Sequence, residues 1–318
     1  MIKEQILPLF SGQLRTVLMK AQLEFETLQE IRLRINQPII LYRNRGEFFL
    51  SEQGEQSLDY QKGFRVSAKE LKAIVDAACG YSGYAFEEEI SRGYLTIAGG
   101  HRIGLAGRAV ISEKGVQTLK YISALNIRIA HPITGCADKL QSYFYEESRP
   151  CHVLIISPPG CGKTTLLRDT IRMFSNGIDR NPGVTVGVVD ERSEIAGIYR
   201  GIPAHDLGIR TDVLDGCPKY LGMEMMLRSM APKVLAVDEI GTSDVSSIEN
   251  ALRCGCRVLA TLHGERLRDY FEKPGFASLV KERVFERYIF LKQGQTPGKV
   301  AGIYGRDFEA LWEEEACI

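Results

Sequence analysis

The chain has 318 residues, with 40 basic and 40 acidic side chains and a formal net charge of zero. This length suits one large or two ordinary domains, and zero net charge argues against a strongly basic nucleic-acid binder. No apolar run approaches the about 18 to 20 residues of a membrane helix, and the N-terminus lacks the apolar core of a signal peptide. We therefore expect a cytoplasmic protein without a membrane span of its own.

The first 145 residues combine helical and strand patterns, so we predict an N-terminal α/β domain over residues 1–145. Apolar residues recur with helical spacing over 9–18 and 68–78, and Ser67 is a plausible N-cap of the second helix. Period-two alternation and glycine turns predict strands over residues 31–35, 38–42, 94–97, 101–111 and 126–129. The polar segment 145–150, which contains a proline, is the expected domain boundary.

Residues 146–318 alternate apolar strands with helices, the pattern of a mostly parallel sheet covered on both faces. The strands are expected over residues 153–156, 185–189, 234–237 and 257–262, and the helices over 163–174, 221–230 and 245–252. Ligands bind such sheets at the carboxyl ends of the strands, and here polar residues follow all four strands.

A phosphate-binding loop is predicted between the first of these strands and its helix. Its residues are Ser157, Pro158, Pro159, Gly160, Cys161, Gly162, Lys163, Thr164 and Thr165. The backbone N–H groups of such a turn surround phosphate oxygens, and the following helix directs its positive end at them. Lys163 is expected to reach the β- and γ-phosphates of ATP, and Thr164 to offer its hydroxyl to Mg²⁺. Ser157 stands where the strict pattern has glycine.

Carboxylates follow two further strands. Asp238 is placed to hold Mg²⁺, and Glu239 to orient or deprotonate the attacking water. The segment 190–194 contains Glu191 and Glu194, which are candidates for polarising that water; a solvated charged loop is the simpler alternative. His263 ends the fourth strand as a candidate sensor of the γ-phosphate, with an ordinary packed histidine as its alternative. The eight cysteines contain no Cys-x-x-Cys pair and indicate neither zinc nor disulfides.

Four segments resemble, in this order, the four sequence boxes of the secretion ATPase superfamily: the phosphate loop, the segment 190–194, Asp238-Glu239 and the Thr261-Leu262-His263 run. The second box reads Asp-Glu-Arg-Ser-Glu here instead of Glu-Asp-Pro-x-Glu. Residues 30–34, 99–107, 157–165 and 189–196 are more closely similar to a sporulation-protein family of endospore-forming bacteria. The resemblance covers nearly the whole chain.

That resemblance implies a RecA-like P-loop domain over 146–318 and a mother-cell cytoplasmic ATPase at the base of a channel to the forespore. It also implies a homo-hexameric ring docked on membrane-embedded sporulation channel proteins. Ring motors often complete their site with an arginine from a neighbouring subunit. The candidates are Arg102, Arg108, Arg128 and Arg192.

Two other functions remain open from the sequence. A nucleic-acid motor of the same fold could track a phosphate backbone with arginines on the N-terminal strands, although zero net charge and the lack of stacking aromatics count against it. A nucleotide-gated scaffold would bind ATP with little turnover, and the presence of Glu239 argues against it.

Overall fold

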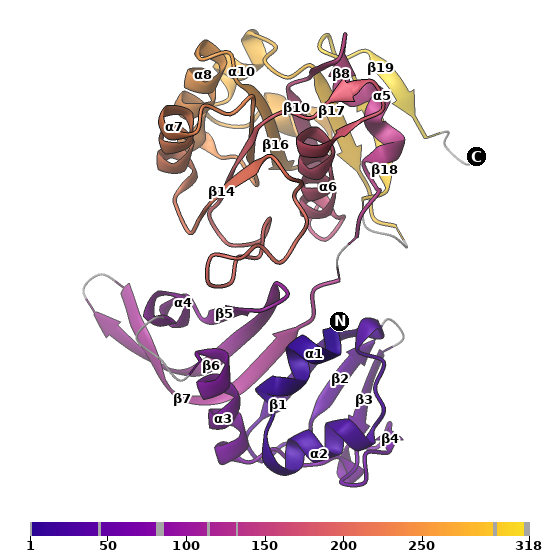
Figure 1. Ribbon diagram of the computed structural model, residues 1–318, viewed down its shortest axis with the longest axis vertical. Helices are drawn as coiled ribbons and strands as arrows, with labels where there is room; N and C mark the ends of the chain where they lie inside the picture. The colour runs from indigo at the N-terminus through magenta and orange to yellow at the C-terminus, as the bar shows by residue number, and fades with distance from the viewer. Residues whose placement is uncertain are drawn as a thin grey trace. The chain divides into compact units, whose positions relative to one another are not determined.

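The chain forms two compact units, which are described separately. The computed structural model describes residues 2–43, 46–80, 86–112, 115–131, 133–294 and 298–314. The first unit contains Met1–Pro132 and Gly197–Ala204, and the second contains Ile133–Ala196 and His205–Ile318 (Figure 1). The sequence places the boundary near residue 145, whereas the units separate after residue 132. Residues 133–145 belong to the second unit, where the buried Ala137 donates its N–H to Asp169 Oδ2 at 2.7 Å and Phe144 packs edge-on against Phe174.

The first unit is built on an antiparallel sheet that, within the described residues, has seven strands in the order β4-β3-β2-β1-β7-β6-β5. The strands are β1 Leu28–Arg34, β2 Ile40–Arg43, β3 Gly46–Leu50, β4 Gln56–Ser57, β5 Tyr94–Ile97, β6 His101–Ser112 and β7 Gly115–Arg128. In β1 the apolar residues Leu28, Ile31 and Leu33 are fully buried, while Arg32 and Arg34, which alternate with the last two, are partly exposed. The alternation in sequence therefore becomes one core face and one polar face.

Helices α1 Ile2–Ile6, α2 Gly12–Lys20, α3 Ala68–Ala78 and α4 Glu87–Ser91 complete this unit. The predicted N-cap of α3 is confirmed, since Ser67 and Glu70 form a reciprocal capping box. The other oxygen of Glu70 accepts the N–H of Leu14 at 3.0 Å, which ties the start of α2 to the start of α3.

The second unit has a larger sheet with the order β14-β13-β15-β16-β10-β17-β18-β19 among the described residues. The strands are β10 Val153–Ser157, β13 Val186–Asp190, β14 Thr211–Asp215, β15 Val234–Val237, β16 Arg257–His263, β17 Arg287–Leu291, β18 Val300–Tyr304 and β19 Ala310–Glu313. Pairings from β14 to β17 are parallel, and those of β18 and β19 are antiparallel. The expected mixed α/β architecture is confirmed.

Helices cover both faces of this sheet. They are α5 Gln141–Phe144, α6 Lys163–Asn176, α7 Lys219–Ser229, α8 Val245–Arg253, α9 Leu267–Phe271 and α10 Ala277–Lys281. The unit also contains two short hairpins, β8 Tyr145–Glu146 with β9 Arg149–Pro150 and β11 Gly177–Ile178 with β12 Asn181–Pro182. Residues of α7 to α10 share one core with the sheet, and α6 packs against β10, β13 and β16 from the other side. Every residue of β10, β13 and β15 is buried. Continuous burial explains why these strands are apolar without alternation.

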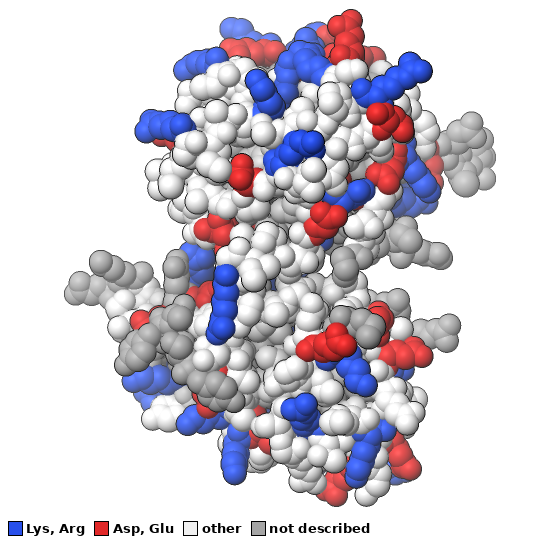
Figure 2. Space-filling model, in the orientation of Figure 1, with Lys and Arg blue, Asp and Glu red and all other residues white. Residues whose placement is uncertain are grey.

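Two surface properties bear on the expected partners. In Figure 2, basic and acidic side chains are interspersed over the visible face, with no single-sign patch. Among the described residues, no helix has the length and apolarity needed to cross a bilayer.

Candidate functional site

The phosphate loop lies between the end of β10 and the start of α6. Gly160 and Gly162 have φ angles of +76° and +92°, which side chains other than glycine rarely adopt. A Cβ atom at Gly160 would meet nothing within 4 Å, so the space above the loop is open. Ser157 is fully buried and donates its hydroxyl to the Pro158 carbonyl at 2.8 Å. An open glycine turn at the start of a 14-residue helix fits a phosphate group.

Lys163 begins α6 and is 6% exposed. Its ammonium donates to the Ser157 carbonyl at 3.4 Å and to His263 Nδ1 at 3.1 Å. Burial lowers the pKa of Lys163, while the nearby Glu239 and Asp238 carboxylates act in the opposite direction. The ammonium of Lys163 is therefore partly desolvated, and a partly desolvated cation gains from pairing with an anion.

Asp238, directly after β15, is bound by two hydroxyl groups. Thr164 Oγ1 donates to Asp238 Oδ2 at 2.6 Å, and Thr261 Oγ1 on β16 donates to Asp238 Oδ1. The pairing of Thr164 with Asp238 joins the phosphate loop to the neighbouring acidic strand end. These oxygens are hard ligands of the type that Mg²⁺ prefers alongside phosphate oxygens and water.

Glu239 follows in an unusual backbone conformation, with a φ of +51°. Its N–H donates to Thr261 Oγ1 at 2.8 Å, so one threonine side chain contacts both acidic residues. Its carboxylate lies 2.7 Å from His263 Nε2 and 3.5 Å from Arg192 Nη1. Because the Lys163 ammonium can only donate to Nδ1, Nε2 of His263 carries the proton that Glu239 accepts.

Asp190, the last residue of β13, lines the small pocket that also contains Asp238 and Glu239, and its carboxylate holds the following turn. Its carboxylate accepts N–H groups from Glu194 at 2.8 Å, Ile195 at 3.0 Å and Ala196 at 2.8 Å. Burial raises the pKa of Asp190, and these three hydrogen bonds oppose that rise. From the helix side, Arg168 donates to the carbonyls of Ile195 and Glu194 at 2.8 and 2.9 Å.

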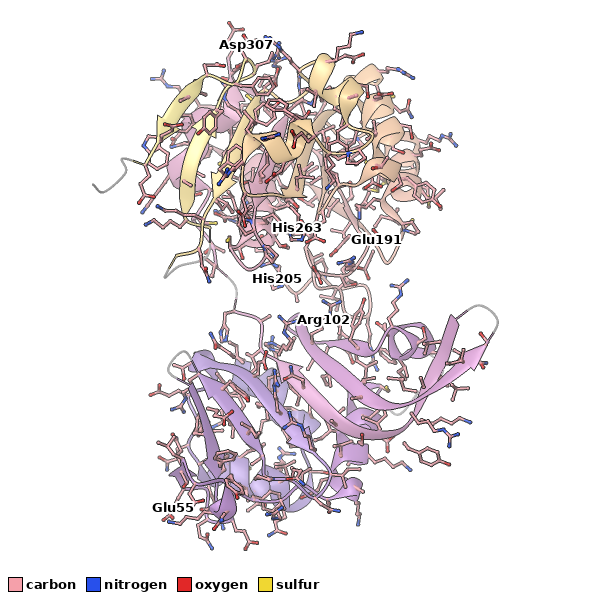
Figure 3. The ribbon with its side chains drawn as sticks, turned by 180° about the vertical axis from the view of Figure 1, so that it is seen from behind. Glu55, Arg102, Glu191, His205, His263 and Asp307 are labelled. Atoms are coloured by element: carbon pink, nitrogen blue, oxygen red, sulfur yellow. The ribbon has the colours of Figure 1, made fainter. Side chains whose placement is uncertain are left out.

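Glu191 and Glu194 lie in this turn. Glu191 pairs with Lys219 Nζ of α7 at 2.6 Å. A small pocket is lined by both residues together with Asp238, Glu239, Arg192 and Lys219. In Figure 3, Glu191 and His263 lie at the same end of the second unit. The four predicted catalytic residues therefore meet at one edge of the sheet, but the Glu191 carboxylate has a lysine partner.

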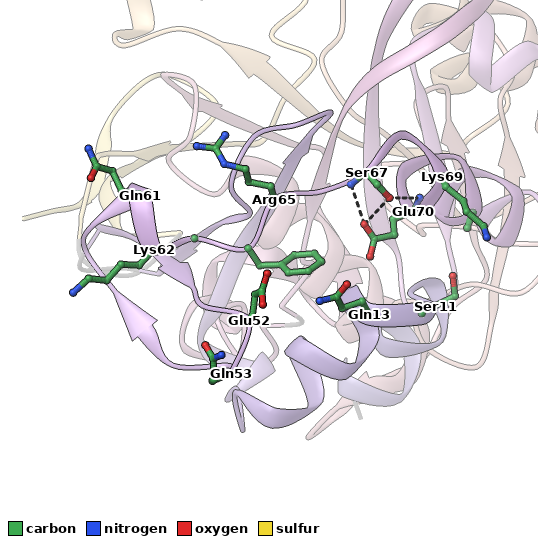
Figure 4. A pocket seen from close by; sticks show the side chains of 14 residues that line it. Ser11, Gln13, Glu52, Gln53, Gln61, Lys62, Arg65, Ser67, Lys69 and Glu70 are labelled. Atoms are coloured by element: carbon green, nitrogen blue, oxygen red, sulfur yellow. Dashed lines mark hydrogen bonds between the residues drawn. The ribbon is translucent and has the colours of Figure 1, made fainter.

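Another pocket, in the first unit, has a volume of about 780 Å³ and is lined by exposed polar side chains around Ser67 and Glu70 (Figure 4). It contains none of the motif residues. Of its two carboxylates, Glu52 and Glu70, the second already accepts hydrogen bonds from the backbone N–H groups of Leu14 and Ser67. We therefore place the chemistry at the smaller pocket, because the functional groups that line a pocket indicate a site better than the volume of the pocket does.

The remaining loop residues contribute backbone atoms to the turn. The Cys161 thiol donates to the Pro159 carbonyl at 3.8 Å, and Cys136 Sγ lies 3.9 Å from the carbonyl of Thr165. Three residues with specific contacts were not predicted as site residues: Thr261, Arg168 and Lys219. Thr261 had a sequence signal, because it belongs to the same strand end as His263. The other two come from helices whose facing surfaces the sequence does not reveal.

The arginines expected to act between subunits differ in their surroundings. Arg192 is close to Glu239 of its own chain, as given above. In the first unit Arg102 stacks on the ring of Tyr94 at 3.8 Å, Arg128 lies 3.9 Å from Glu30, and Arg108 is exposed on β6.

The oxygen ligands also agree with a metal that is bound together with substrate. Within the described ranges, no cluster of three or more His, Cys, Asp or Glu side chains could hold a metal ion. Asp238 and Thr164 alone provide one carboxylate and one hydroxyl. Such a sparse set suits Mg²⁺, which commonly takes its other ligands from phosphates and water.

Comparison with known proteins gives consistent matches. The family described as "Sporulation stage III, protein AA" matches residues 1–311. Stage III sporulation protein AA of Bacillus subtilis (strain 168) is 44% identical over 285 residues, which is 89% of each chain. The Legionella pneumophila ATPase DotB has a TM-score of 0.53 at 15% identity, covering 88% of this chain and 76% of that one.

The pilus retraction motor PilT, solved with bound ADP, has a TM-score of 0.52 at 12% identity over 90% of this chain and 77% of its own. At these identities DotB and PilT show a shared fold. The family match over residues 1–311 and the 44% identity establish more than the fold, because they cover most of the chain. The chain therefore belongs to the family of sporulation stage III protein AA.

Proposed function

We propose that this protein is a Mg²⁺-dependent, RecA-like P-loop ATPase that energises a channel complex between mother cell and forespore. The observation that carries the proposal is the 2.6 Å hydrogen bond from Thr164 to Asp238, with Glu239 one residue further on. It joins a phosphate-type loop to a carboxylate pair at the edge where α/β sheets bind ligands.

Each residue has a distinct role in this proposal. The loop N–H groups and Lys163 bind the phosphates of ATP, and Thr164 and Asp238 hold the metal. Glu239 orients and deprotonates the attacking water, with Glu191 and Glu194 as secondary carboxylates in the same pocket. His263 lies between Lys163 and Glu239, so its hydrogen bonds change when either of these side chains moves toward ATP. Bound Mg²⁺ would neutralise charge on the β- and γ-phosphate oxygens.

The cellular role rests on the family and on the fold. We propose that the protein works in the mother-cell cytoplasm as a homo-hexamer docked on membrane-embedded sporulation channel proteins, with the N-terminal unit responsible for assembly. The similarity to a sporulation protein supports a role in sporulation, and the fold shared with DotB and PilT supports an ATP-driven motor. On the face shown in Figure 2, basic and acidic side chains are interspersed, and such a surface does not favour binding along a nucleic-acid backbone.

Phosphate release tests this function. Purified protein with ATP and Mg²⁺ is compared with Lys163→Ala, and ATP binding is followed separately by thermal stabilisation. The proposal expects binding and release by the wild type, with both strongly reduced in Lys163→Ala. Binding without release at any protein concentration would instead favour a nucleotide-gated scaffold. Stimulation by single-stranded nucleic acid that disappears with salt would favour the nucleic-acid motor.

A further inference from the structure

The backbone around Glu239 is fixed by hydrogen bonds on both sides of the residue. Its own N–H donates to Thr261 Oγ1 at 2.8 Å, and the N–H of Ile240 donates to the Thr261 carbonyl at 2.9 Å. A residue other than glycine keeps a left-handed conformation such as that of Glu239 only where its surroundings hold it there. Ile240 is 2% exposed, so its carbonyl needs a hydrogen-bond donor as well.

That donor is Lys273, which lies between α9 and α10. Its half-buried side chain donates from Nζ to the Ile240 carbonyl at 3.4 Å and passes over the ring of Phe276, 5.4 Å from its centre. Burial lowers the pKa of Lys273, and the negative charges of Glu239 and Asp244 oppose this change. The ammonium is therefore close enough to Glu239 for the two charges to attract each other.

A second contact ties the loop 272–276, which carries this lysine, to the same segment of the site. Thr242 Oγ1 donates to the Pro274 carbonyl at 2.7 Å. Gly275 has a φ of +83°, and a Cβ atom there would collide with Thr242 Cγ2, so only glycine allows this close approach. Phe276 is fully buried in the core that the sheet shares with α7 to α10. The loop is thus anchored in the unit and holds the chain after the acidic pair at two points.

We infer that Lys273 is a positioning residue for Glu239. His263 and Arg192 contact the Glu239 carboxylate itself, whereas Lys273 holds the backbone that carries it. A misplacement of about 1 Å in a group that orients a reactant costs about 100-fold in rate, so this anchor bears directly on the attacking water. The inference deepens the proposed ATPase function and rests on it, because it assigns a further residue of the chain to the same reaction.

Steady-state phosphate release by Lys273→Met tests this role. Methionine keeps most of the apolar length of the lysine side chain but cannot donate a hydrogen bond to a carbonyl. We expect kcat to fall by about 10- to 100-fold, while the ATP concentration for half-maximal release changes by less than about threefold. Lys281→Met, the same substitution at an exposed position at the end of α10, is the matched control and should keep the wild-type values.

Two further variants separate positioning from an effect on folding. In Glu239→Gln the carboxylate is already lost, so Lys273→Met leaves nothing further to misplace, and the double variant should release phosphate within about twofold of Glu239→Gln. Loss of folded protein would instead lower the rate by the same factor in both backgrounds. Thr242→Val removes the second contact of the loop at an exposed position, and it should lower kcat by less than Lys273→Met does, without changing the ATP dependence.

Three results would overturn the inference: a wild-type kcat in Lys273→Met, a rise in the half-maximal ATP concentration as large as the fall in kcat, or an equal loss in the two backgrounds. Each of these results requires a wild type that releases phosphate, so it leaves the proposed function intact. A wild type that binds ATP without releasing phosphate would contradict the proposed function, and the role of Lys273 would fall with it.

Discussion

The same dipeptide, Asp-Glu, occurs at the ends of two strands of the second unit and meets two different surroundings. Asp190, the last residue of β13, is 2% exposed and accepts three backbone N–H groups from the turn that it begins. Asp238, directly after β15, accepts hydrogen bonds from two hydroxyl groups, that of Thr164 at the start of α6 and that of Thr261 on β16. The Asp190 carboxylate therefore holds a turn, whereas the Asp238 carboxylate joins two threonine side chains beside the phosphate loop.

The glutamates differ in the same way. Glu191 is 2.6 Å from the Lys219 ammonium, an ion pair that ties the turn to α7. Glu239 contacts His263 and Arg192, and its backbone adopts a left-handed conformation supported by Thr261. The comparison teaches that the partner of the carboxylate, more than the motif or the strand end, separates a structural residue from a candidate catalytic one.

The largest effect that we expect comes from Asp238→Asn. Loss of the carboxylate that would hold Mg²⁺ removes several kcal/mol of transition-state stabilisation, so phosphate release should fall by at least about 1000-fold. The unfolding midpoint in denaturant should change little, because the amide can still accept a threonine hydroxyl. Titration of Mg²⁺ against phosphate release checks the assignment. A variant that retains the wild-type rate and Mg²⁺ dependence would show that the metal lies elsewhere.

Asp190→Asn should produce the opposite pattern. The substitution leaves one acceptor oxygen for three buried N–H donors, and we expect a loss of about 2 to 3 kcal/mol in the free energy of unfolding. Denaturant titration measures that loss. At temperatures where the variant remains folded, phosphate release should survive far better than in Asp238→Asn. If stability is unchanged and release is abolished, the two aspartates have been assigned to the wrong roles.

The smallest of these effects concerns Thr261, which contacts both acidic residues of the site. Thr261→Val keeps the shape of the buried side chain but removes the hydroxyl that positions Asp238 and Glu239. We expect phosphate release to fall by about 10- to 100-fold, as for other groups that orient metal ligands. The Mg²⁺ concentration needed for half-maximal release should rise. Thr261→Ser should recover most of both quantities; equal defects in the two variants would point to packing instead of positioning.

Much of the second unit could be predicted because its signals are local. The strands β10, β13, β15 and β16 are continuous apolar runs, and the phosphate loop has a compact motif with fixed spacing. The half-exposed β14 lacks such a run and pairs with the distant β13, whereas β18 and β19 are short strands that pair with each other as a hairpin. In the first unit, β7 extends back to Gly115, and the register shifts in its pairing with β6 break the period-two alternation that would have revealed this extension in the sequence.

The sequence places the candidate site residues near one another but does not give their contacts. Asp238, Glu239 and His263 follow strands, so parallel topology brings them together. The role of Asp190 depends on the backbone geometry of its turn, and the pairing of Glu191 depends on where α7 places Lys219. Both are tertiary facts that neither composition nor periodicity encodes.

One pair of variants tests the central claim most directly: Glu239→Gln and Glu191→Gln, compared in phosphate release under the same Mg²⁺ and ATP concentrations. Each changes one carboxylate of the same pocket to its amide. The account predicts that Glu239→Gln still binds ATP, seen as thermal stabilisation, but loses about 100- to 1000-fold in release, whereas Glu191→Gln remains within about tenfold of wild type. Wild-type release by Glu239→Gln, or a larger loss in Glu191→Gln, would contradict it.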